Sequence, residues 1–102
     1  MEEIKEYGLK DGKLAIGLCG EIHSGNADEF YQTVIKAYQA TPADILFDGE
    51  ELDFIDSTAL GAFVKILKTL RTDGRTLGFK NLQAKIKKLF VICSLDTIME
   101  IA

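Results

Sequence analysis

Residues 52–70 constrain the fold more than any other part of the chain. They begin as a short apolar run with a preference for strand, and from Ser57 onwards apolar residues recur at the spacing of a helix. Parallel strands need a crossover between them, usually a helix, so a strand that leads directly into a helix is typical of α/β proteins. We therefore expect an α/β fold. The loop before Ser57 should lie at the carboxyl edge of the sheet, where such folds usually build their sites.

The rest of the chain alternates between strand and helix patterns. The chain begins with two strands joined by a turn at Asp11-Gly12. A helix follows, capped by Ser24 or Asn26 and ending at Thr41-Pro42. The later elements expected are a strand over 44–55 with a turn through Asp48-Gly49, a helix over 57–72, a strand over 75–82, a helix with apolar positions Ile86, Leu89, Phe90 and Cys93, and a last helical turn or two after Ser94.

Length and composition predict one domain spanning residues 1–102. The chain is 47% hydrophobic, enough for a core without metals or disulfides, and Cys19 and Cys93 are expected to be buried, reduced thiols. A net charge of -4 argues against nucleic-acid binding. No apolar run approaches the roughly 20 residues that cross a bilayer, and no leader sequence opens the chain. We expect a cytoplasmic protein, not inserted in a membrane.

Two adjacent hydroxyls, Ser57 and Thr58, follow Asp56 at the predicted helix start. A helix start leaves backbone N–H groups unpartnered, and a single Ser, Thr or Asp side chain suffices to cap it. The simplest interpretation is that one hydroxyl is the cap. Asp56 could also cap, which would leave a hydroxyl free for solvent. A free hydroxyl there suits a phosphate, because the helix dipole and the N–H groups tolerate its negative charge.

Four segments, residues 20–22, 45–48, 56–61 and 88–95, together resemble the bacterial anti-sigma factor antagonists, which are single STAS domains. The resemblance implies a four- to five-stranded mixed sheet with helices packed on it. It also implies phosphorylation of Ser57, with Thr58 as second choice, by an anti-sigma factor serine kinase. The unphosphorylated form would bind the kinase and release its sigma factor, and a serine phosphatase would reset the switch. Such a protein is a binding module without a cofactor, not an enzyme.

Six residues are candidates for the partner-binding surface, and the protein is expected to be a monomer. Leu60 also belongs to the apolar stripe of its helix, which favours burial. The candidates are Asp53, Asp56, Ser57, Thr58, Leu60 and His23.

The chain departs from the family pattern at two positions. Ala59 replaces the usual Gly, a change that favours the helix unless a partner must approach closely. His23, the only histidine, stands where the family commonly has Asp. A lone loop histidine usually serves as a hydrogen-bonding or surface residue, although it could pair with a phosphoserine.

Two other functions compete with the phosphorylation switch. A hydrolase triad of Ser57, His23 and Asp56 is disfavoured, because no G-x-S-x-G elbow is present and Asp56 is adjacent to the supposed nucleophile. The stronger alternative is a STAS regulatory subunit of another assembly without a phospho-switch, such as a stress-signalling complex, a histidine-kinase pathway or a lipid-transport ATPase.

Overall fold

The computed structural model describes residues 1–102 and contains a five-stranded mixed sheet in the order β1-β2-β3-β4-β5. Only β1 runs antiparallel to its neighbour; the other pairs are parallel. The elements are β1 (Ile4–Lys10), β2 (Lys13–Ile22), α1 (Ala27–Ala40), β3 (Asp44–Ile55), α2 (Ser57–Thr72), β4 (Leu77–Lys80), α3 (Ala84–Ile92), the 3₁₀ helix η1 (Leu95–Thr97) and β5 (Glu100–Ile101). The predicted α/β class is confirmed, and none of these helices is long and apolar enough to cross a bilayer.

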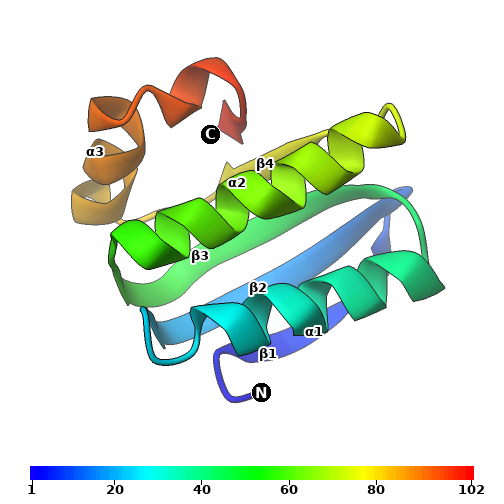
Figure 1. Cartoon of the computed structure of the whole chain (residues 1–102), viewed down its shortest axis with the longest axis horizontal. Helices are drawn as coiled ribbons and strands as arrows, with labels where there is room; N and C mark the ends of the chain where they lie inside the picture. Colours follow the sequence, from blue (N-terminus) through cyan, green and yellow to red (C-terminus); the bar gives the residue numbers. More distant parts are fainter.

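Helices α1 and α2 cover one face of the sheet, and α3 lies near the start of α2 (Figure 1). Parallel strands place their carboxyl ends at one edge, so the loops that lead into α1 and α2 lie together there (Figure 1). The pairing of Ile22 with Ile55 brings the last residues of β2 and β3 side by side. The strand-to-helix loop predicted at Ser57 therefore has a second loop as its immediate neighbour.

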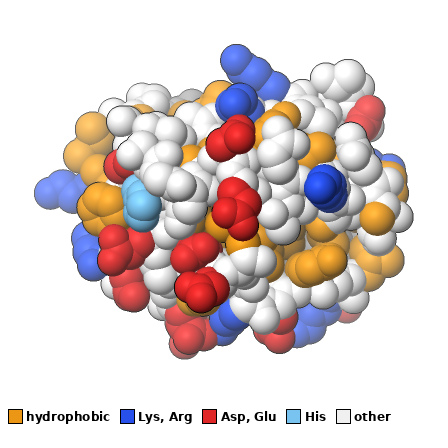
Figure 2. Space-filling model, turned by 60° about the horizontal axis from the view of Figure 1, so that its bottom comes forward, with side chains coloured by type: hydrophobic (Ala, Val, Ile, Leu, Met, Phe, Trp, Pro, Cys, Tyr) orange, Lys and Arg blue, Asp and Glu red, His pale blue; other side chains and the backbone are white.

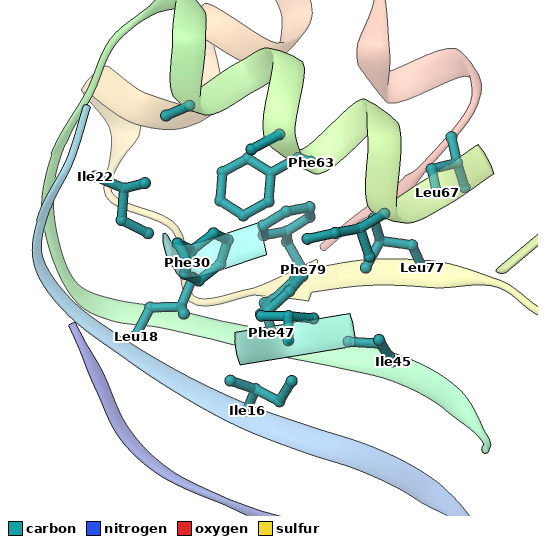
Figure 3. Close-up of a cluster of buried hydrophobic side chains, with 14 of the residues drawn as sticks. Ile16, Leu18, Ile22, Phe30, Ile45, Phe47, Phe63, Leu67, Leu77 and Phe79 are labelled. Atoms are coloured by element: carbon teal, nitrogen blue, oxygen red, sulfur yellow. The ribbon is translucent and has the colours of Figure 1, made fainter. Parts of the chain in front are cut away.

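The core between the helices and the sheet is built around phenylalanine rings (Figure 3). Phe63 of α2 packs edge-on against Phe79 with ring centroids 4.9 Å apart, and against Phe30 at 5.4 Å. Edge-to-face contacts of this kind add to the free energy of burial. All five buried rings have less than 2% of their surface exposed; they are Phe30, Phe47, Phe63, Phe79 and Phe90.

The tight turn between β1 and β2 is confirmed, whereas the turn predicted at Asp48-Gly49 is wrong. Asp11 and Gly12 both have positive φ, as their turn requires. Asp48 and Gly49 instead lie inside β3, where Gly49 is buried. A β-carbon on Gly49 would lie 2.5 Å from the Leu82 Cδ2 atom, so a side chain there would displace the Leu82 side chain. The register of β2 and β3 shifts after Gly17, and β3 continues through a bulge.

The expectation that both thiols are buried is wrong. Helix α3 ends at Ile92, so Cys93 becomes its C-cap, leaves the apolar stripe and is exposed. Cys19 is half-buried, and its thiol donates to the Glu2 carbonyl at 3.0 Å. After Ser94 the chain forms only one 3₁₀ turn and then β5, a strand that helical periodicity did not predict.

Candidate functional site

Asp56 joins the two loops at the carboxyl edge of the sheet. Its Oδ1 accepts a hydrogen bond from Ala59 N at 2.9 Å and caps α2, as the sequence predicted was possible. Its Oδ2 accepts from Ser24 N, also at 2.9 Å, in the loop between β2 and α1. These bonds, the one from Ala59 first, hold the pKa of the Asp56 carboxyl below its ordinary value. One ionised side chain therefore fixes both loops.

The hydroxyls of Ser57 and Thr58 are free of the capping role. Both residues are exposed in the first turn of α2, and neither hydroxyl forms a hydrogen bond within the chain. Ala59, by contrast, is fully buried and donates its amide to Asp56. The methyl group that replaces the family glycine therefore lies in the core. It adds nothing to the surface that carries Ser57.

The β2–α1 loop is held in shape by its own polar side chains. Gly25 N donates to His23 Nδ1 at 2.9 Å, so a neutral His23 carries its proton on Nε2. Asn26 Oδ1 accepts from His23 N, and Asn26 Nδ2 donates to the Glu21 carbonyl, each at 2.9 Å. Asn26 occupies the N-cap position of α1, but its side chain caps nothing, so the predicted capping bond from Ser24 or Asn26 is absent.

These bonds disfavour the hydrolase triad. His23 Nδ1 accepts from Gly25, and both Asp56 oxygens accept from backbone amides. No hydrogen bond joins His23 to Ser57 or to Asp56. A triad needs both contacts, one to activate the serine and one to orient the imidazole.

Leu60 and Asp53, two further candidates for the partner-binding surface, lie in surroundings that differ from those of Ser57. Leu60 is buried with 9% of its surface exposed, so its assignment to the partner-binding surface is wrong and its core role is confirmed. Asp53 is exposed and accepts from Gln83 Nε2 at 3.2 Å, on the side of β3 that faces the start of α3. Asp53 thus borders the surface around Ser57, but its hydrogen bond is to Gln83 at the N-cap of α3.

Phe54 is 48% exposed next to this site, which the sequence pattern did not predict. Strict alternation would put Phe54 on the buried face with Leu52. The register instead shifts here, because Gly20 pairs with Leu52 and Glu21 with Phe54, which leaves Asp53 as an extra residue. This bulge turns Phe54 outwards. No local sequence signal identifies the bulge.

A groove between α1 and α2 opens beside Thr58. Its volume is about 280 Å³, and Thr58, Gly61 and Asp28 are among the residues that line it. Lys65 lies at the same groove, with its Nζ 4.9 Å from the centroid of the Tyr31 ring. Acidic side chains and the single histidine are visible on this side of the molecule (Figure 2). The site is thus an exposed surface that borders a groove between α1 and α2.

Comparison with known proteins identifies the family of the chain. The model of the STAS domain family matches residues 5–102. The chain belongs to the STAS domain family. The anti-sigma-B factor antagonist of Listeria monocytogenes is 33% identical over 100 residues, which cover 97% of this chain and 85% of the relative.

Solved STAS structures show the same fold. A Thermotoga maritima protein assigned to the anti-sigma factor antagonists matches with a TM-score of 0.86 and 24% identity, over 94% of this chain and 83% of that one. The anti-sigma factor antagonist SpoIIAA in its unphosphorylated form matches with a TM-score of 0.73 and 17% identity, over 95% and 86%. Bacillus SpoIIAA in the phosphorylated form matches with a TM-score of 0.72 and 20% identity, over 95% of this chain and 89% of that one.

Proposed function

We propose that this STAS domain is an anti-sigma factor antagonist whose binding to an anti-sigma factor serine kinase is switched off by phosphorylation of Ser57. The unphosphorylated form binds the kinase and releases its sigma factor, and a serine phosphatase restores that form. The name of the Listeria relative supports the general function. The observation that carries the switch is the exposed, unbonded Ser57 hydroxyl, with Asp56 supplying the helix cap.

Because Asp56 caps the helix, the Ser57 hydroxyl is free to accept a phosphoryl group. A serine that caps its own helix must break a backbone hydrogen bond before its oxygen can attack a phosphoryl group. Here Ala59 N bonds to Asp56, so modification of Ser57 leaves the cap intact. SpoIIAA has been solved in an unphosphorylated and in a phosphorylated form, and both structures match this fold with similar TM-scores, 0.73 and 0.72. A switch that keeps the scaffold unchanged is consistent with that pair.

The added charge explains how binding would be lost. A phosphate carries a charge of about -1.5 to -2 and strongly hydrated oxygens, and here it is placed next to the ionised Asp56. In a packed interface such a charge loses its water without gaining a partner. The penalty is several kcal/mol, on the order of a thousandfold in affinity.

The test is to map phosphate after incubation with ATP and a candidate anti-sigma factor kinase. We expect one phosphate on the wild-type chain and none on Ser57→Ala, which should still bind the kinase. Thr58→Ala is the matched control, because Thr58 is equally exposed one residue further along the same turn. It should be phosphorylated as fast as the wild type. Phosphate on the Ser57→Ala variant would transfer the site to Thr58 or elsewhere. Kinase binding without any phosphate would favour a STAS subunit that lacks the switch.

His23 has a separate part in the proposal, at the step that resets the switch. Its Nδ1 accepts from Gly25, which leaves the Nε2 proton free to bond to a phosphate oxygen. The loop that carries it is tied to Asp56 through Ser24. Such a bond makes phosphorylated Ser57 longer-lived, so dephosphorylation should be slower for the wild type than for His23→Asp. Equal rates with one phosphatase would remove this role.

A further inference from the structure

Strand β1 is an open edge of the sheet. It pairs with β2 on one side only, and all of its residues from Lys5 to Lys10 are exposed. Tyr7 and Leu9 are each 61% exposed, although the residues that they pair with, Ile16 and Leu14, are buried. The opposite edge of the sheet, β5, has only two residues. The one long edge of this fold therefore carries two large apolar side chains.

Most proteins protect such an edge with a bulge, a proline or a charge that interrupts pairing. In β1 the only irregularity lies between Ile4 and Glu6, and the side chain of the bulged residue, Lys5, forms an ion pair with Glu51. The following residues, 6–10, keep a regular register with β2. Their outer backbone groups are available to another strand.

We propose that the strand that fits this edge is β1 of a second copy of the chain, antiparallel and centred on Gly8. In that register Glu6 of each copy faces Lys10 of the other, and Tyr7 faces Leu9. Opposite charges and an aromatic–aliphatic pair are both favourable across strands. Neither Glu6 nor Lys10 has an ion-pair partner within its own chain, where the only ion pair joins Lys5 and Glu51.

The two sets of pairs lie on opposite faces of the sheet, because side chains alternate along a strand. Tyr7 and Leu9 share the face of their β2 partners Ile16 and Leu14, which is the face covered by the helices. There Tyr7 lines a groove of about 390 Å³ with residues of α1, of which Ala37 and Ala40 offer Leu9 of the second copy an apolar contact, while Thr33 and Lys36 are polar. Gly8 at the centre has nothing within 4 Å of a β-carbon position, so it does not hinder approach.

The resulting dimer is a continuous ten-stranded sheet with isologous symmetry. It differs from the monomer expected above. Because the two copies of β1 are antiparallel, the carboxyl ends of β2 in the two copies point in opposite directions. Ser57 then lies exposed at opposite edges of the dimer. This inference does not rest on the proposed function, because kinase binding and dimerisation use different surfaces.

Analytical ultracentrifugation of the full chain tests the register. The wild type should show a reversible monomer–dimer equilibrium. Glu6→Lys places Lys against Lys10, and Lys10→Glu places Glu against Glu6, so each single variant should dimerise on the order of tenfold more weakly. The double variant, Glu6→Lys with Lys10→Glu, restores opposite charges and should regain the wild-type dissociation constant. An equimolar mixture of the two single variants should form heterodimers, which native mass spectrometry distinguishes by mass when one of the two variants is labelled with ¹⁵N.

The substituted side chains are exposed, so thermal melting should show all variants folded. A wild-type chain that stays monomeric up to about 1 mM would overturn the proposal. A dimer that neither single variant weakens, or that the double variant fails to restore, would overturn it equally.

Discussion

Helix α2 carries two regions with opposite surroundings. Phe63, in its second turn, is fully buried and meets the rings of Phe30, Phe47, Phe79 and Phe90. Ser57, at the first residue of the same helix, is exposed and bonded to nothing in the chain. The buried ring holds the helix on the sheet, and this rigid support presents the serine at the edge. Stability and the candidate switch therefore depend on different residues of one element and can be perturbed separately.

The largest effect is expected from Phe63→Ala. Loss of the ring removes buried apolar area and leaves a cavity, so the free energy of unfolding should fall by about 3–5 kcal/mol. Phe54→Ala is the matched control, because the Phe54 ring is already 48% exposed and should cost far less. Urea unfolding of both variants gives the comparison. Equal losses would show that the phenylalanine cluster does not dominate stability.

A smaller effect is expected from Asp56→Ala, which removes both the cap of α2 and the bond to Ser24. The melting temperature should fall by about 5 °C. Asp56→Asn keeps one oxygen acceptor for the cap of α2, but its NH2 group cannot accept from Ser24 N, so it should recover only part of that loss. If Ala and Asn melted alike, the hydrogen bonds of Asp56 would not contribute to stability.

The pH dependence of stability separates the contribution of the Asp56 charge from that of its hydrogen bonds. Its pKa in the folded protein lies below the ordinary 3.8, so the ionised form stabilises the fold. This contribution should be complete above about pH 4 and disappear as the pH falls through the folded-state pKa. The gap in melting temperature between wild type and Asp56→Asn should therefore close on acidification. A gap that is the same at neutral and acidic pH would contradict the assignment.

The smallest effect on stability is expected from Ser57→Ala. The Ser57 hydroxyl forms no hydrogen bond within the chain, so the free energy of unfolding should change by less than about 0.5 kcal/mol. The same substitution should abolish phosphate incorporation. Urea unfolding in parallel with the phosphate assay measures both properties on one sample. A large destabilisation would mean that the hydroxyl has a structural role.

The features that sequence reasoning predicted correctly depend on neighbours in the chain. The Asp11-Gly12 turn follows from two adjacent residues that accept positive φ. The order of residues at the start of α2 left two capping alternatives, a hydroxyl or Asp56, and the structure shows that Asp56 is the cap. The periodicity of α2 likewise predicted that Leu60 belongs to the core.

The features that it missed depend on distant contacts. Gly49 lies within β3, and Leu82, far along the chain, packs where a side chain at Gly49 would be. Phe54 turns outwards because of a bulge that only the register with β2 reveals. Strand β5 has two residues, and it exists through pairing with β4 rather than through any local preference. The bond from Ser24 to Asp56 likewise joins two loops that are separate in sequence.

The central claim is that a phosphate on Ser57 abolishes docking while the scaffold stays as it is. The most direct test is a calorimetric titration of the anti-sigma factor kinase with unmodified chain and with chain phosphorylated at Ser57. We predict that the phosphorylated chain binds on the order of a thousandfold more weakly. Equal affinities for the two forms would contradict the account.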